Sequence, residues 1–462
     1  MDKRIQKGII VIFLANIINL FFSLATNFLL PKYLSVESYA AIKTFQLYIS
    51  YAGLLHLGYV DGVYLKYGGK DLSHNISGDF YTNRSTMLIF QLVVTCAFFT
   101  IAIFTKDVIL LLFTVSIFPL NMANYYKFLY QATGEFKLYG QVMNITTIST
   151  FLVNMVLLFV LQVDNYVIFI SFYVMLYFII WAYLDLYFRK HHRVEKGKVF
   201  KLDELFVNVR SGILLTFGNL ASLLLTGMDR WFVKALMNTL AFAQYSFAVS
   251  VENFLNLAIT PVTTTLYNYF CKEDSLIKHK QVFQYVLIFS TILPAAAFPV
   301  RFILEVFLTD YIDSSLVVFL LFAAQMFYIV IKAVHVNLYK VQRRQKIYFR
   351  NLIIVLIVGF VLNCICYMIL KTKEAFALGT LLSSIIWYFI SIKDFKDLSP
   401  TKKEMSYHFS ELVLFLLCGT YFNAVCGMIV YFLGTIFLLM LLMNEPMIYT
   451  FKSLRRKILI RK

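Results

Sequence analysis

Long apolar runs separated by short polar segments dominate the pattern of this chain. A helix needs about 20 mostly apolar residues to cross the hydrocarbon core of a bilayer. Runs of that kind predict about fourteen membrane-spanning helices, near residues 9–30, 39–58, 85–103, 108–124, 139–160, 165–187, 212–232, 240–267, 283–300, 314–335, 351–370, 375–392, 411–424 and 426–443. The last two are the weakest, and 411–443 can be read as a short hairpin or as one long tilted helix. We therefore expect an all-α polytopic membrane protein.

The composition supports this interpretation. Hydrophobic residues make up 60% of the 462 positions and charged residues only 15%, against about 25% charged residues in an ordinary soluble domain. A soluble fold of this size cannot bury so much apolar surface. A disordered chain, a secreted disulfide scaffold and a soluble enzyme are excluded on these grounds.

The formal net charge of +17 comes from 42 Lys and Arg residues against 25 Asp and Glu residues. If the N-terminus lies in the cytoplasm, most of these cations fall in the cytoplasmic segments between helices, as the positive-inside rule requires. Both termini are then cytoplasmic. The charge is assigned to anionic lipid headgroups, and no nucleic-acid partner is expected.

The two halves of the chain resemble each other. The segment Leu129–Tyr139, after the fourth predicted helix, aligns with Leu338–Tyr348 after the tenth. At nearly the same spacing, a polar stripe of the first helix aligns with one of the seventh; its members are Asn16, Asn19, Ser23, Thr26 and Asn27, opposite Asn219, Ser222, Thr226, Asp229 and Arg230. Six helices separate the partners, which predicts a parallel repeat about an axis normal to the membrane.

This repeat predicts the domain organisation. We expect a six-helix bundle over 1–190, a basic cytoplasmic linker over 191–211, a second six-helix bundle over 212–395, and a hairpin with a basic tail over 396–462. The site is expected at the interface between the two bundles.

Four stretches resemble the bacterial polysaccharide flippases of the Wzx type, within the superfamily of multidrug, oligosaccharidyl-lipid and polysaccharide exporters. They are Leu30–Tyr39, Leu57–Val63, Tyr130–Lys137 and the Asp-Arg stretch Leu225–Val233. The resemblance covers about residues 5–395. It departs from the family pattern at Ala40, where the family usually has Gly, and in a first helix without the acid that sodium-coupled drug exporters often carry.

The resemblance implies a function. Such flippases move undecaprenyl-diphosphate-linked oligosaccharide across the bacterial cytoplasmic membrane by alternating access, for O-antigen or capsule synthesis. A polysaccharide polymerase and glycosyltransferases would be partners in the pathway. The alternatives are a multidrug antiporter of the same superfamily and a membrane polymerase or glycosyltransferase, which usually needs a longer outer loop than this chain offers.

Polar side chains are costly against lipid, so a stripe of them is expected to face protein or water. The predicted cavity lining consists of Asn16, Asn19, Ser23, Lys43, Gln46, Asn219, Ser222, Thr226, Arg230 and Lys332. Lys43 is the candidate contact for an anionic diphosphate. The competing interpretation is hydrogen bonding between helices for the neutral residues and snorkelling to the headgroups for the lysines.

Glu252 lies near the middle of a predicted membrane helix, with Asn256 on the expected same face. An intramembrane carboxyl is a functional hypothesis by default, and we assign ion coupling to Glu252, Asp229 and Asn256, with a proton or sodium ion as the coupled species. Arg230 is expected to pair with Asp229. A buried carboxyl satisfied by neighbouring amides is the alternative for Glu252.

Motifs for catalysis are missing from the sequence. It has no G-x-x-x-x-G-K-[ST] loop, no H-E-x-x-H and no G-x-S-x-G, which are the signatures of nucleotide, zinc-protease and serine-hydrolase sites. We therefore expect no enzyme, no metal centre and no cofactor.

Overall fold

The computed structural model describes residues 3–68, 75–76, 78–133, 135–191, 193–194, 197–273 and 275–443. For some of these, including residues 3–17, only the backbone is described. The side chain of Asn16 and the basic tail after residue 443 therefore lie outside the described residues.

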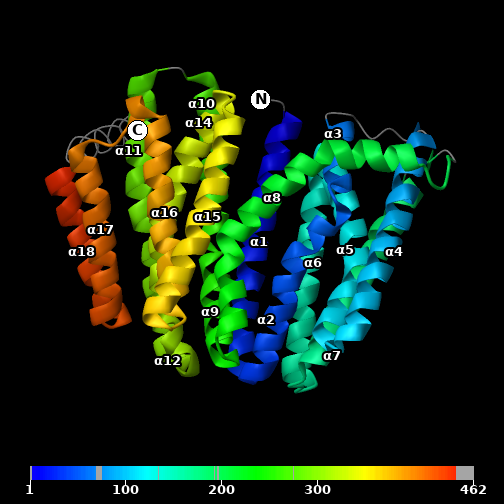
Figure 1. Cartoon of the computed structure of the whole chain (residues 1–462), viewed down its shortest axis with the longest axis horizontal. Helices are drawn as coiled ribbons and strands as arrows, with labels where there is room; N and C mark the ends of the chain where they lie inside the picture. The colour runs from blue at the N-terminus through cyan, green and yellow to red at the C-terminus, as the bar shows by residue number, and fades with distance from the viewer. Residues whose placement is uncertain are drawn as a thin grey trace, which may run out of the picture. The chain divides into compact units, whose positions relative to one another are not determined.

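The described chain is almost entirely helical (Figure 1), which confirms the predicted fold class. Its first helices are α1 (Lys3–Tyr33), α2 (Val36–Tyr51), α3 (Tyr59–Tyr67), α4 (Gly78–Thr105), α5 (Val108–Ala132), α6 (Phe136–Met155), α7 (Tyr166–His191), α8 (Leu202–Leu236) and α9 (Thr239–Glu252). The remaining helices are α10 (Leu255–Lys272), α11 (Leu276–Ile292), α12 (Ala297–Val306), α13 (Ser315–Val330), α14 (Val336–Val341), α15 (Gln345–Leu370), α16 (Glu374–Asp394), α17 (Lys402–Tyr421) and α18 (Ala424–Leu442). Two short strands, β1 (Asn75–Ile76) and β2 (Arg193–Val194), pair in parallel.

Each of the fourteen predicted segments coincides with helix. In the described part of the chain, ten helical stretches are long and apolar enough to cross a membrane, so this is a multi-pass membrane protein. The full count of fourteen crossings stays a prediction. Residues 411–443 form two helices, α17 and α18, separated at Phe422 and Asn423, where the Asn423 side chain accepts a hydrogen bond from the backbone of Cys426 and caps α18.

The chain divides into two compact units, residues 1–224 and 225–462. The boundary falls inside α8, which contributes its first part to unit 1 and its last turns to unit 2. Part of the predicted linker is therefore regular helix, because α7 continues to His191 and α8 already begins at Leu202. The predicted domain limits themselves stay a prediction.

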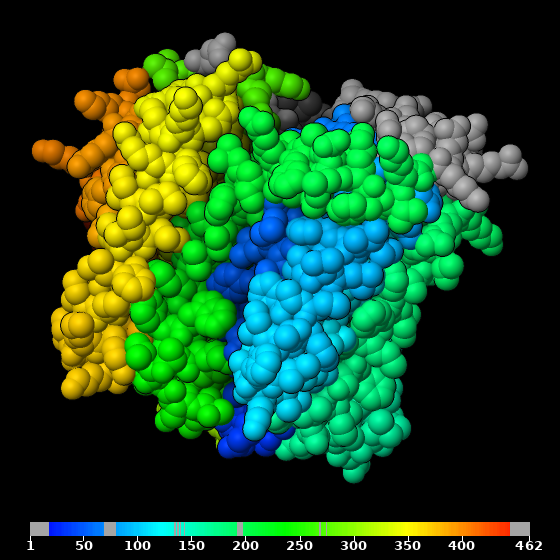
Figure 2. All heavy atoms as spheres, turned by 45° about the vertical axis from the view of Figure 1, so that its right-hand side comes forward, coloured from blue at the N-terminus to red at the C-terminus, as the bar shows by residue number. Residues whose placement is uncertain are grey.

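In unit 1, the start of α8 is hydrogen-bonded to the end of α3 and to the start of α4. Lys66 and the Asn83 side chain both donate to the Glu204 carboxylate, at 2.9 and 3.0 Å. Figure 2 shows this part of α8 lying directly against the start of α4. The backbone of α8 also approaches α3 closely, because a Cβ on Gly62 or on Gly212 would collide with the backbone of the opposite segment.

The same glycine-rich contact interrupts the predicted second helix. Leu57 and Gly58 both have positive φ, 50° and 87°, so the predicted run 39–58 ends as a left-handed turn that glycine adopts without steric cost. α3 then starts in a new direction.

In unit 2, α13 forms the buried core, and almost all of its side chains are covered by neighbouring helices. A π-helical turn, Ile331–His335, follows α13 and leads into α14. Such turns carry one extra residue and are frequent at functional sites.

Each unit has an aspartate towards the end of a helix that accepts a hydrogen bond from a tyrosine, although the two tyrosines do not occupy equivalent positions. Asp185 at the end of α7 accepts a hydrogen bond from Tyr126, and Asp394 at the end of α16 accepts one from Tyr339 at 2.5 Å. Asp394 follows Asp185 at the spacing that separates Tyr339 from Tyr130. The aspartates therefore occupy equivalent positions in the repeat read from the sequence.

Candidate functional site

A group of buried and half-buried polar and charged side chains in unit 2 surrounds Glu252. We call it the Glu252 cluster and define it by Asp229 on α8, Tyr245 and Glu252 on α9, Gln325 on α13 and Lys332 in the π-helical turn. Sequence analysis selected three of these five residues, and the fold brings them together from separate helices.

Glu252 is buried, with a residual exposure of 9%. The Gln325 side chain donates to its Oε1 at 2.6 Å, and Asp229 and Lys332 interact with the carboxyl electrostatically. The other amide atom of Gln325, Oε1, is buried without a hydrogen-bond partner in the described residues. The carboxyl is thus held by one amide and lies between an acid and a base.

The helix carrying Glu252 breaks immediately after it. α9 ends at Glu252 and α10 begins at Leu255. At the break, tight turns replace the α-helical pattern, with Phe254 N donating to Val251 O at 3.1 Å and Asn256 N donating to Asn253 O at 3.2 Å. Broken membrane helices expose backbone groups that can serve ions.

This break corrects the prediction of a continuous helix over 240–267 with one polar face. Glu252 at the end of α9 is buried while Asn256 in the first turn of α10 is half-buried, and the turn at Asn253 separates the two helices. Asn256 is still part of the site. Its Oδ1 accepts from Lys332 at 3.4 Å, which links it to the cluster through the lysine rather than through a shared helix face with Glu252.

Asp229 is fully enclosed by hydrogen-bond donors. Tyr245 OH donates to its Oδ2 at 2.6 Å, the backbone N of Arg230 donates to Oδ1 at 2.8 Å, and Thr380 Oγ1 lies 3.5 Å from Oδ2. The predicted ion pair between Asp229 and Arg230 is not formed among the described residues, where Arg230 Nε is buried without a partner. The adjacent positions on a helix point in different directions, so the backbone N–H reaches Asp229 and the guanidinium does not.

Lys332 does not snorkel toward an aqueous end. Its Nζ reaches Asn256 and lies 5.5 Å from the centre of the Tyr328 ring, a distance suited to a cation–π contact. The π-helical turn sets its direction, since the extra residue rotates the chain after α13.

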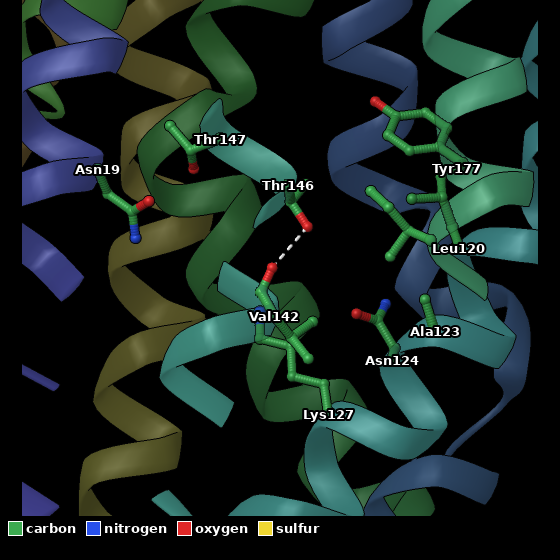
Figure 3. Close-up of a pocket in the computed structure, with 10 residues that line it drawn as sticks. Asn19, Leu120, Ala123, Asn124, Lys127, Val142, Thr146, Thr147 and Tyr177 are labelled. Atoms are coloured by element: carbon green, nitrogen blue, oxygen red, sulfur yellow. Dashed lines mark hydrogen bonds between the residues drawn. The ribbon is translucent and has the colours of Figure 1, made fainter. Parts of the chain in front are cut away.

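Unit 1 contains a separate cavity of about 210 Å³ between α1, α5, α6 and α7 (Figure 3). We call it the Lys127 pocket; it is lined by Asn19, Leu120, Ala123, Asn124, Lys127, Val142, Thr146, Thr147, Tyr177 and Ile180. In the close-up, Asn19 faces the pocket from one side, while Asn124 and Tyr177 lie opposite. Asn19 is the one predicted site residue that lines it.

The other predicted residues of unit 1 lie elsewhere. Lys43 is buried and donates to Asn27 Oδ1 at 2.8 Å, with the Tyr39 ring centre 5.3 Å from its Nζ. Ser23 contributes its backbone carbonyl to the Asn27 side chain at 2.9 Å. Gln46 is half-buried on α2. Lys43 therefore contacts side chains of unit 1, as expected of a lysine with a structural role.

The polar stripe of α8 is exposed at the surface of the structure. Asn219, Ser222 and Thr226 are all exposed, and they take no part in the Glu252 cluster. The stripe continues into Asp229 one turn later, where the side chain is buried.

Several site residues were missed from the sequence. Gln325 can be recognised from the sequence, because it is the only amide in a long apolar run. A polar side chain inside a membrane segment is costly and often has a function. Lys127 lies beyond the predicted end of the fourth helix at residue 124, whereas α5 continues to Ala132. Tyr245 had no signal, since tyrosines are abundant throughout this chain.

Cation ligands do not cluster in the manner of a dedicated metal site. In the part of the chain that the structure describes, no group of three or more His, Cys, Asp or Glu side chains is placed to hold a metal ion.

Comparisons with known proteins give a fold but no close relative. No protein-family model matches the chain, and no curated protein matches it. Among solved structures, the chain is similar to lipid II flippase MurJ in an inward closed conformation, with a TM-score of 0.71 and 14% identity over 95% of this chain and 99% of that one. It is also similar to the eukaryotic MATE transporter AtDTX14, with a TM-score of 0.54 and 13% identity over 88% of this chain and 97% of that one. The chain therefore has the fold of these transporters along nearly its whole length.

Proposed function

We propose that the protein is a transporter that flips an undecaprenyl-diphosphate-linked oligosaccharide across the bacterial cytoplasmic membrane, by alternating access and driven by a proton or sodium gradient. The main support is the fold, which matches a protein described as a lipid II flippase over 95% of this chain. The four stretches that resemble polysaccharide flippases, above all Leu225–Val233 with its Asp-Arg pair, support the same substrate class.

The Glu252 cluster supplies the coupling site in this proposal. A charged side chain near the centre of a membrane helix costs about 2.5–3.5 kcal/mol or more. The single amide hydrogen bond from Gln325 returns about 1.5–3 kcal/mol at most when the acceptor is charged. The stability of the fold therefore gains little from Glu252. A side chain that binds and releases a cation, in contrast, must be able to carry a negative charge.

The local geometry suits a carboxyl whose charge changes during the cycle. Gln325 can donate to Glu252 whether that carboxyl is ionised or protonated, so the hydrogen bond survives the change. The broken helix after Glu252 places backbone groups beside the carboxyl, as in other ion-coupled transporters.

Transport is tested directly in proteoliposomes. The purified full chain is reconstituted with a fluorescently labelled, undecaprenyl-diphosphate-linked oligosaccharide, and an impermeant quencher measures the fraction in the outer leaflet. We expect protein-dependent movement between leaflets, faster with an imposed proton or sodium gradient. Movement at the rate of protein-free vesicles under every gradient would refute the proposal.

The coupling role is tested with Glu252→Gln, which keeps shape and hydrogen-bonding capacity but removes the titratable charge. Glu273→Gln is the matched control, because Glu273, which follows α10, pairs with the exposed Lys278 in the first turn of α11 and lies outside the Glu252 cluster. Glu252→Gln should still bind substrate but lose the acceleration by a gradient, and Glu273→Gln should keep it. If both variants respond to gradients like the parent, Glu252 is not the coupling residue.

Drug export is the second candidate, favoured by the match to a MATE transporter at a TM-score of 0.54. It predicts gradient-dependent efflux of organic cations such as ethidium from vesicles holding the protein. The flippase proposal predicts no such efflux, so one assay separates the two.

A further inference from the structure

The Lys127 pocket contains polar side chains that unit 1 itself does not satisfy. Asn19 is only 8% exposed, and its Oδ1 is buried without a hydrogen-bond partner. Asn124, Thr147 and Tyr177 also line the cavity, and their side chains make no hydrogen bond within the described part of the chain. These four side chains come from four different helices and converge on one space (Figure 3).

Neighbouring polar residues behave differently, which makes this observation informative. Polar side chains in membrane helices normally find partners on an adjacent helix or on their own backbone. Tyr173 OH donates to Asn154 Oδ1 at 2.5 Å, and Thr150 Oγ1 donates to the Thr146 carbonyl at 2.9 Å. The same two helices thus give these polar groups a partner outside the pocket. Inside it, Thr146 bonds to its own helix, but Thr147 and Tyr177 make no hydrogen bond within the described part of the chain, as expected of a site that receives a ligand.

The charge of the pocket selects the ligand. Among the described residues that line the pocket, Lys127 is the single basic side chain, and none is Asp or Glu. The remaining lining groups are amides and hydroxyls, which are the usual partners of sugar hydroxyls. An anionic group bearing hydroxyls therefore fits better than a cation or an apolar molecule.

The size limits how much of a substrate can enter. The cavity of about 210 Å³ is smaller than the ~300–1,000 Å³ of sites that enclose a whole drug-sized ligand. It suits one compact group rather than a complete oligosaccharide.

We propose that the Lys127 pocket is a subsite for one anionic group of the transported molecule, a carboxylate or phosphate with neighbouring hydroxyls, with Lys127 opposing its charge and Asn19, Asn124 and Tyr177 binding its hydroxyls. This inference rests on the proposed function for its place in transport. It extends that function by requiring a specific acidic group in the cargo.

Binding to the purified full chain in detergent micelles tests the inference by isothermal titration. Three probes are compared: cellobiouronic acid, which carries a sugar carboxylate; cellobiose, its neutral counterpart; and farnesyl diphosphate, which carries the phosphate linkage without sugar. The parent should bind at least one anionic probe more tightly than cellobiose. Lys127→Met should weaken that binding by about 10- to 100-fold, the range for losing a hydrogen bond to a charged group, while cellobiose binding stays unchanged.

Two further variants exclude trivial explanations. Lys278→Met removes an exposed lysine in the first turn of α11 and should leave all three affinities at the parent value. Lys127→Arg keeps the charge and should retain most of the preference, which a mere folding defect would not allow. An unchanged gel-filtration profile confirms that each variant is folded.

The probes also separate the two sources of the anion. Loss of cellobiouronic acid binding assigns the pocket to an acidic sugar, and loss of farnesyl diphosphate binding alone assigns it to the diphosphate; both support an anion subsite. Equal affinity of parent and Lys127→Met for all three probes overturns it. If the charge preference is present while proteoliposomes show no flipping, the proposed function fails and the subsite stands.

Discussion

The buried pair of Arg84 and Asp185 in unit 1 gives a quantitative prediction of stability. Arg84 Nε lies 2.9 Å from Asp185 Oδ1 and 2.7 Å from Tyr126 OH, and its Nη2 also binds Oδ1. The two charged side chains are each only 9% exposed, whereas Arg189, which binds the other carboxylate oxygen at 2.8 Å, is 59% exposed. Arg84→Met therefore leaves the Asp185 charge buried with one largely exposed partner.

The magnitude follows from these exposures. Removing one member of a buried ion pair costs about 3–5 kcal/mol, and the exposed Arg189 offsets at most about 1 kcal/mol of this. We expect a loss of about 2–4 kcal/mol in the free energy of unfolding. For a unit of this size, where each kcal/mol moves the midpoint by about 2–4 °C, the apparent Tm should fall by roughly 5–15 °C.

Thermal unfolding of the purified protein in detergent, followed by intrinsic fluorescence, measures the shift. Arg189→Met is the control and should lower the apparent Tm by no more than about 4 °C. The double variant Arg84→Met with Asp185→Leu should recover most of the loss, because replacing both members of a buried ion pair by apolar side chains is often neutral or stabilising. Equal shifts for Arg84→Met and Arg189→Met, or no recovery in the double variant, would refute the reasoning.

Two more predictions concern packing and topology. Gly212→Ala should lower the apparent Tm, with a cost of about 1–3 kcal/mol for overpacking against the Gly58 backbone, while Gly218→Ala on the same helix, where a Cβ meets nothing within 4 Å, should raise it slightly because Ala favours helix by up to about 1 kcal/mol; the reverse order would contradict the close approach of α3 and α8. In single-cysteine variants of intact cells, an impermeant maleimide should label the exposed Cys426 before permeabilisation and the exposed Cys271 only afterwards, as the positive-inside orientation predicts; labelling of Cys271 from outside would reverse the topology.

The positions of the helices could be predicted from the sequence because lipid imposes a simple rule on length and polarity. Three helix starts are set by local capping instead, at Ser35, Asn238 and Asn423, whose side chains each accept from the first turn that follows; the apolar runs alone place these starts one to three residues later. The intramembrane acid Glu252 was identified for a related reason, since its cost makes it conspicuous in an apolar run.

The internal geometry of the site could not be predicted in the same way. The break after Glu252 contains no Gly or Pro, so it depends on the packing around α9 and α10 rather than on local propensity. The partner of Glu252 is on α13, far away in sequence, and the direction of Lys332 depends on a π-helical turn that has no local signature. The predicted end of the fourth helix comes too early because its last turns are polar. The sequence pattern therefore does not place Lys127 in a membrane helix.

The π-helical turn Ile331–His335 makes this site sensitive to the number of residues in the chain as well as to their identity. A π turn is an α-helix with one residue inserted, and one residue corresponds to about 100° of rotation in a helix. Deleting a single residue within the turn would let the helix become regular and would rotate the segment that follows it relative to α13. Asn337, whose side chain donates to the Thr263 carbonyl at 2.8 Å, would then lose this hydrogen bond to α10. In homologous chains, a gap of one position at this point should therefore mark a change in how this segment packs against α10, even where Glu252 and Lys332 are both retained.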